Sequence, residues 1–177
     1  ESLRTLSTGS SNVSLGHSAM YNHGTSIRNI AIGQNAMNGN TSGIASNYNV
    51  AIGYSSMNQI NSGSNGNVAI GYLSLNQITT GDNNVAIGYQ AGYYVTTGGK
   101  NVILGSYDGN SGGLDIRTSS NNVVISDGDG NIRAYFNSSG VPQLAGLNYP
   151  TSDGTSGQFL TTDGSGTLSF ADAGGGG

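Results

Sequence analysis

The sequence predicts an all-β protein: a parallel β-solenoid or β-roll of short coils, followed by small β modules. The first observation behind this prediction is an internal repeat. The segment Asn-Val-Ala-Ile-Gly stands at 49–53, 67–71 and 84–88, with variants at 12–16, 29–33, 101–105 and 122–126. The second is the period of 17 to 20 residues between the motif glycines, which is too short for a pair of helices. The third is the composition, 34% hydrophobic and 8% charged with 31 glycines, which is too polar for a thick core.

The Val-Ala-Ile core of each repeat predicts a short strand. Alternation in a strand places Val50 and Ile52 on one face and Ala51 on the other. Valine and isoleucine favour strands because they are branched at Cβ. We expect the valines and isoleucines to form the interior of each coil.

A glycine ends each predicted strand, where the chain needs a positive φ or a close backbone approach. These turn positions are Gly16, Gly33, Gly53, Gly71, Gly88 and Gly105. The remainder of each unit is expected to hold a second extended stretch and a second turn. Methionine and leucine at positions such as Met57 and Leu75, and apolar residues at Ile60, Ile78 and Val95, are expected to complete a thin interior.

An asparagine opens each repeat. Stacked asparagines tolerate turn geometry and can form an amide ladder between coils. We therefore interpret this column as structural: Asn12, Asn29, Asn49, Asn67, Asn84 and Asn101.

The NVAIGY motif resembles the head repeats of trimeric autotransporter adhesins and related repeats in tail-fibre proteins of tailed phages. The stretch 149–170 resembles a module found in such fibres. The resemblance implies a parallel β-roll assembled as a homotrimer, side by side or intertwined, with a valine and isoleucine core and small residues at part of the trimer contact. The adhesin heads have a shorter repeat, so an extra loop or a longer second strand is expected here. The membrane-anchoring barrel that ends such adhesins is not seen, which favours a phage origin.

Breaks in the repeat divide the chain into five parts. We expect an N-terminal lead-in over 1–11, head-like repeats over 12–105, a β-hairpin capping module over 106–145, a fibre-like β module over 146–173 and a glycine linker over 174–177. Within the capping module, strands are expected at 122–126 and 131–136.

Reactive groups are scarce. The net charge of −4 and the lack of a basic cluster argue against nucleic acid as a partner, and no apolar run is long enough for a membrane helix. His17 and His23 have no third metal ligand at a matching spacing and are expected at a solvated surface. Asp127, Asp129 and Asn131 fit the start of a calcium loop, but a hairpin turn explains them better. We expect no enzyme activity, metal or cofactor, and a polysaccharide depolymerase is the least favoured alternative.

Tyrosines recur at one phase of three coils, at Tyr54, Tyr72 and Tyr89. Such a column either stabilises a trimer or stacks on sugar rings, and we favour the first interpretation. The sequence therefore predicts a structural shaft of a virion tail fibre or cell surface that supports attachment to a host receptor. The alternative is an adhesin whose β-roll binds a host glycan or protein through the tyrosines. The expected partners are copies of the same chain, other fibre or virion proteins, and a host receptor.

Overall fold

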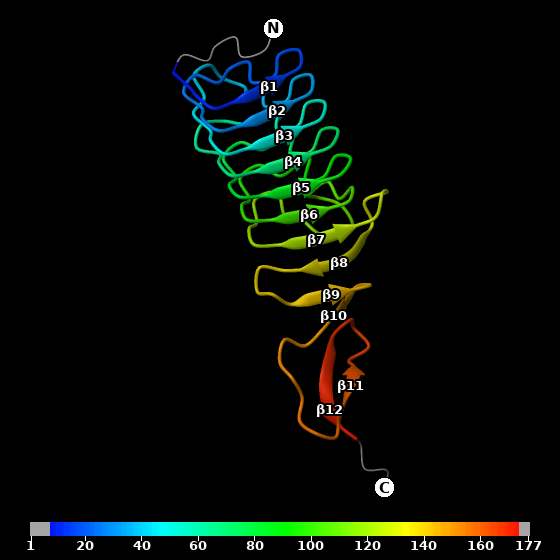
Figure 1. Ribbon diagram of the computed structural model, residues 1–177. Coiled ribbons are helices and arrows are strands. Elements are labelled where there is room, and N and C mark those ends of the chain that lie inside the picture. The colour runs from blue at the N-terminus through cyan, green and yellow to red at the C-terminus, as the bar shows by residue number, and fades with distance from the viewer. Residues whose placement is uncertain (1–7, 174–177) are drawn as a thin grey trace.

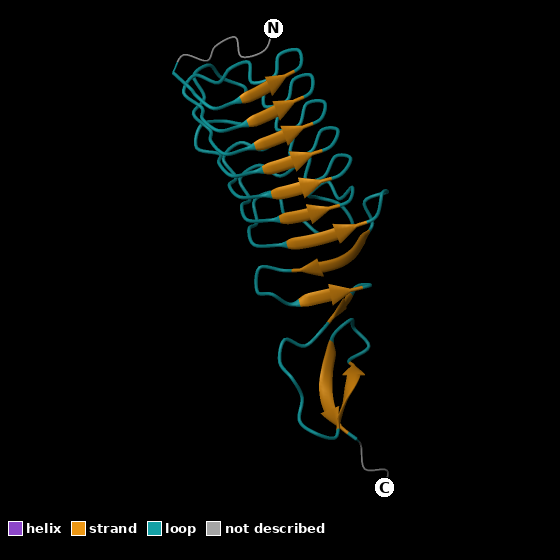
Figure 2. Cartoon of the chain, in the orientation of Figure 1, coloured by secondary structure: helices purple, strands orange, loops and turns teal. Residues whose placement is uncertain are grey.

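The computed structural model describes residues 8–173, and these residues contain strands and turns but no helix. Ten strands form one sheet in chain order, and two more form a separate hairpin (Figures 1 and 2). The strands of the sheet are β1 (Val13–Leu15), β2 (Ile30–Ile32), β3 (Val50–Ile52), β4 (Val68–Ile70), β5 (Val85–Ile87), β6 (Val102–Leu104), β7 (Val123–Ser126), β8 (Ile132–Phe136), β9 (Pro142–Leu144) and β10 (Leu147–Asn148).

The first seven strands form a parallel solenoid, as the sequence predicts. Each Val-Ala-Ile strand pairs with the next in exact motif register, so Val50 lies beside Val68, Ala51 beside Ala69 and Ile52 beside Ile70. The parallel pairing continues beyond Gly105, because β7 pairs with β6. The array of coils is therefore longer than the 12–105 segment expected for the repeats.

Each coil contains one strand of three residues, or four in β7, and turns and bends occupy most of the rest instead of a regular second strand. The longer coils keep the same interior. Ile44 and Ile116, which lie in the two longest coils, are fully buried, as are Ile60, Ile78 and Val95. The added residues therefore lie in surface turns and leave the stack of coils intact.

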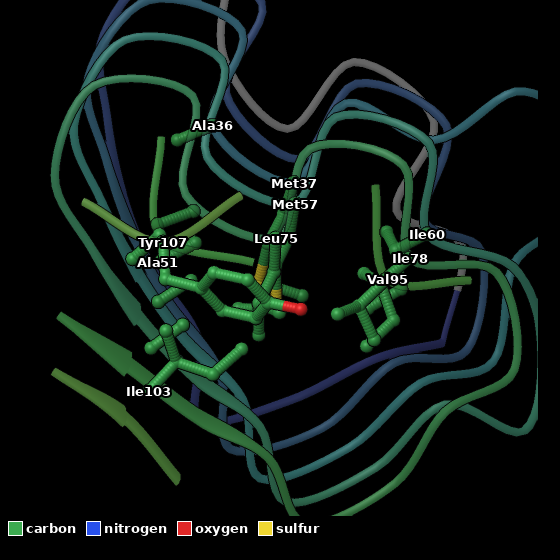
Figure 3. Close-up of a cluster of buried hydrophobic side chains, with 14 of the residues drawn as sticks. Ala36, Met37, Ala51, Met57, Ile60, Leu75, Ile78, Val95, Ile103 and Tyr107 are labelled. Atoms are coloured by element: carbon green, nitrogen blue, oxygen red, sulfur yellow. The ribbon is translucent and has the colours of Figure 1, made fainter. Parts of the chain in front are cut away.

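The expectation that valine and isoleucine fill the coil interior is wrong. Ala31, Ala51, Ala69 and Ala86 point inward and are completely buried, whereas their valine and isoleucine neighbours lie on the outer face. The methionine and leucine column fills the interior, as expected. Figure 3 shows Met37, Met57 and Leu75 stacked between the sheet and a second aliphatic column of Ile60, Ile78 and Val95. Because those side chains fill the interior, the sheet adds only the methyl groups of its alanines to the core of the central coils.

The solenoid ends where the chain reverses. β7 and β8 form an antiparallel pair, which confirms the strands expected at 122–126 and 131–136. The turn between them is held by Asp127, whose Oδ1 accepts hydrogen bonds from the backbone nitrogens of Asp129 (3.0 Å) and Asn131 (2.9 Å). β9 and β10 extend the sheet by antiparallel pairing.

The last two strands, β11 (Gln158–Thr162) and β12 (Leu168–Asp172), pair antiparallel as a two-stranded sheet. This hairpin meets the long sheet through a bridge between Asn148 and Thr167 and a hydrogen bond from the Asn148 nitrogen to the Gly166 oxygen (2.8 Å). The expected linker at 174–177 and most of the expected lead-in lie outside the described residues.

Candidate interaction face

The outer surface of the long sheet carries two apolar columns, which we call the outer face. In each strand of the solenoid the first and third residues point outward, and the strand register stacks them on their equivalents in the next coil. The first column holds Val13, Ile30, Val50, Val68, Val85, Val102 and Val123, and the second holds Leu15, Ile32, Ile52, Ile70, Ile87, Leu104 and Ile125.

Both columns continue past the solenoid. Phe136 and Pro142 extend the first column, and Ala134 and Leu144 extend the second, as the register of β8 and β9 shows. All outward positions over nine strands are therefore apolar. At about 4.8 Å per strand the face is roughly 40 Å long. The exposed fractions at its ends are high, 66% for Leu15 and 41% for Leu144.

The motif glycines allow the coils to stack this closely. A Cβ built on Gly71 would lie 2.1 Å from the carbonyl oxygen of Gly88, and one built on Gly53 would lie 2.3 Å from that of Gly71. Gly71 has a φ of +136°, which residues with side chains rarely adopt. The sequence interpretation of these glycines, as turns that need positive φ and close approach, is confirmed.

The asparagine column forms the predicted amide ladder. The Oδ1 atom of Asn49 accepts hydrogen bonds from the backbone nitrogen (2.8 Å) and Nδ2 (3.2 Å) of Asn67. The Oδ1 atom of Asn67 does the same for Asn84, at 2.9 and 3.0 Å. From Asn29 to Asn101 the ladder residues are fully buried. Buried amides with satisfied hydrogen bonds fix the register of adjacent coils.

A tyrosine from β8 caps this ladder. Asn122, the last ladder residue, accepts a hydrogen bond at Oδ1 from the hydroxyl of Tyr135 (2.9 Å). No further coil supplies a partner there, because the chain has already reversed direction. Tyr135 therefore satisfies an acceptor that would otherwise be left open at the end of the solenoid. This role could not be predicted from the sequence, because it depends on the antiparallel pairing of β7 and β8.

The three tyrosines singled out from the sequence do form a column. The ring centroids of Tyr54 and Tyr72 are 5.4 Å apart with an interplanar angle of 13°, and those of Tyr72 and Tyr89 are 5.2 Å apart with an angle of 7°. Each tyrosine follows the motif glycine, so the column adjoins the isoleucine column of the outer face. The exposed fractions of the three tyrosines lie between 43% and 57%.

The stacking limits what the tyrosines can bind. The facing sides of adjacent rings cover each other, so a ligand meets mainly ring edges and hydroxyl groups. Sugar rings stack on aromatic faces, and in this column only the two end rings have an outward face without a tyrosine neighbour. The geometry therefore favours contact along the column over insertion of sugars between its members.

The two histidines differ in environment, and the expected solvated position is wrong for His23. His17 is exposed, whereas His23 is fully buried in the first coil. Its Nδ1 lies 2.9 Å from Ser26 Oγ, and its Nε2 is buried without a hydrogen-bond partner. Burial lowers the pKa of His23 to about 4. The side chain is therefore neutral at pH 7.

Asp115 and Asp127 accept backbone hydrogen bonds within turns. Hydrogen bonds from Arg117 lower the pKa of Asp115 to about 2, and those from Arg133 lower the pKa of Asp127 to about 2. Between residues 8 and 173 no group of three or more metal-binding side chains gathers, and no helix is suited to cross a bilayer.

One repeated feature of the backbone could not be predicted from the sequence. Three non-glycine positions in most coils have left-handed backbones, at the residue before the motif asparagine and two and four residues after the motif glycine. One coil illustrates them with Tyr48 (φ 60°), Ser55 (φ 50°) and Met57 (φ 47°). Such conformations are uncommon for methionine and tyrosine, so residue identity alone gives no signal for them.

Comparison of the chain with protein-family models, with curated proteins and with solved structures gave no match.

Proposed function

We propose that this chain is a structural shaft element that assembles side by side with copies of itself through the outer face. The observation that carries the proposal is the unbroken pair of apolar columns over nine strands. Monomeric soluble proteins rarely expose a contiguous apolar surface of this extent. A regular coil spacing allows identical flat faces to meet along their whole length.

The proposed assembly is a homotrimer within a fibre of a virion or cell surface that projects a receptor-binding tip. The NVAIGY motif supports this choice through its resemblance to adhesin heads and phage fibres. Because valine and isoleucine point outward, the proposed contact between copies uses different residues from those that the resemblance implied. The aliphatic columns make the contact, while the small residues that the resemblance implied for it face the interior instead.

Sedimentation equilibrium tests the assembly. The expected mass is three times that of one chain. A Val68→Glu/Val85→Glu variant should sediment as a monomer with its β-sheet circular dichroism retained, because charged side chains on the outer face are solvated only when the copies separate. Thr97→Glu, at an exposed position outside the two columns, is the matched control and should stay trimeric. A monomeric wild type, or a double variant of unchanged mass, would contradict the proposal.

A second candidate function is direct adhesion through the tyrosine column. Its support is the exposure of Tyr54, Tyr72 and Tyr89 next to the outer face. Binding on a glycan array should disappear in a variant with all three changed to alanine. Changing all three to phenylalanine separates the roles of rings and hydroxyls. Array binding that survives the alanine variant would exclude this function for the column.

A structural role also fits the carboxylates. Asp115 and Asp127 are paired with arginines two and six residues away in the chain, which suits turns better than the acid and base of a hydrolase. We therefore propose no catalytic activity for this chain. Release of reducing ends from a host polysaccharide is the assay that would overturn this.

A further inference from the structure

The sheet runs beyond the coils that cover its inner side. The inward column of the solenoid contains Ile103 and Val124, which are fully buried, and strand register continues it to Tyr135 in β8 and Gln143 in β9. The latter two are only partly buried. The inner face of β8 and β9 is thus the open C-terminal end of the solenoid interior.

A cavity of about 470 Å³ occupies this open end. Its lining includes the Gly112–Leu114 segment of the last long coil and Ala145 and Gly146 in the turn between β9 and β10. Asn131 and residues of β8 and β9 complete the lining. This volume lies in the range of pockets that hold small ligands.

The lining combines apolar surface with unused hydrogen-bond acceptors. Leu114, Ile132 and Tyr135 pack against the core and leave part of their surface in the cavity. Asn131 donates from Nδ2 to Asp127, and Gln143 donates from Nε2 to Asn148. The Asn131 Oδ1 and Gln143 Oε1 atoms accept no hydrogen bond from any residue between 8 and 173.

Charge at the cavity is balanced. The Arg133 guanidinium is the only charged group in the lining. Its Nε donates to Asp127 Oδ2 at 3.1 Å, and its Nη2 contacts the same oxygen. An anion would compete with Asp127 for the guanidinium, and a cation would face the guanidinium itself. The pair therefore favours an uncharged ligand.

We propose that this cavity binds a neutral polyhydroxylated ligand of the size of a mono- or disaccharide. Sugar hydroxyls would donate to the two free amide oxygens, and the apolar face of a sugar ring would lie on Tyr135, Leu114 or Ile132. The site does not rest on the proposed self-assembly, because it opens on the inner side of the sheet, opposite to the outer face. It is also separate from the tyrosine column.

Saturation-transfer difference NMR tests the proposal on the whole chain, with glucose, galactose, mannose, N-acetylglucosamine and lactose as probes at millimolar concentration. At least one probe should receive saturation. Gln143→Leu keeps the side-chain bulk and removes the acceptor, so affinity for that probe should fall roughly fivefold to tenfold. The matched control, Gln77→Leu, changes an amide outside the cavity and should leave affinity unchanged.

Absence of transfer to every probe would overturn the proposal, as would equal affinity in the wild type and Gln143→Leu. In that case the cavity is only the open end of the solenoid. If Gln143→Leu does not fold, Gly112→Asn serves as the second variant. A Cβ there would lie 3.8 Å from Ile132 Cδ1 on the cavity wall, and asparagine tolerates the φ of +60°. Its side chain should reduce binding, and unchanged binding would overturn the proposal. The sedimentation mass tests self-assembly independently.

Discussion

The solenoid and the C-terminal hairpin are both built from paired strands, but they are stabilised differently. Each solenoid coil adds a buried amide, a close glycine contact and interior side chains to its backbone hydrogen bonds. The β11–β12 hairpin has backbone pairing, but Phe159 is 60% exposed, Leu160 47% and Phe170 36%. An isolated two-stranded hairpin is marginal in water. Backbone pairing alone is therefore not what makes this chain stable; stacking between coils is.

The largest expected effect comes from breaking the glycine contact. Gly71→Ala places a methyl group 2.1 Å from the Gly88 oxygen and should lower the free energy of unfolding by more than about 4 kcal/mol, because neighbouring coils must separate. Gly63→Ala is the matched control: it also has positive φ (+93°), but its Cβ meets nothing within 4 Å. It should cost about 1 to 2 kcal/mol. Urea unfolding followed by circular dichroism compares the two, and equal losses would refute the role of close stacking.

Removing one ladder amide should have the next largest effect. Asn67→Ala leaves the backbone nitrogen and Nδ2 of Asn84 without their Oδ1 acceptor, and should cost about 3 kcal/mol. Hydrogen exchange at the Asn84 amide should also accelerate. Asn40→Ala, at an exposed turn position, should change stability by less than about 0.5 kcal/mol. A ladder variant as stable as this control would show that the amides are dispensable.

Acidification should weaken the first coil. Because the folded pKa of His23 is about 4 and an unfolded histidine has a pKa near 6.5, the unfolded chain binds more protons between these values. Stability is unaffected by this group above pH 6.5, falls as the pH drops toward 4, and levels off below, with a loss of up to roughly 3 kcal/mol. His23→Ile, which matches the buried Ile44 beside it, should remove this dependence. Thermal melts across that pH range measure it, and parallel pH profiles for the two proteins would contradict the assignment.

The smallest effect is expected in the hairpin. Phe159→Ser should change the unfolding free energy of the solenoid by less than about 0.5 kcal/mol, since Phe159 is outside the core. Ile78→Ala, in the buried aliphatic column, should cost about 3 kcal/mol. Comparable losses in urea titrations of the two variants would mean that the hairpin is part of the cooperative solenoid.

The sequence was sufficient for the parts of the fold that depend on periodicity. Repeat spacing, turn glycines and the asparagine column all follow from the recurrence of NVAIG. Alternation, however, predicts only that Val68 and Ile70 share one face of the strand. It does not predict whether that face points into the coil or out of it. The answer depends on residues elsewhere in the coil, since Met57 and Leu75 already fill the interior and leave space for Ala69 alone. The Tyr135 cap and the cavity at Gln143 could not be predicted from the sequence either, because they depend on where the chain reverses direction.

Cysteine cross-linking tests whether the outer face joins copies of this chain, as we propose. The chain has no cysteine, so Val68→Cys introduces a single thiol in the middle of that face. Treatment with a short bismaleimide should give covalent dimers on a denaturing gel. Thr97→Cys, exposed away from the two columns, should remain monomeric on the same gel. Monomers from Val68→Cys, or equal cross-linking from both variants, would mean that the outer face does not join the copies.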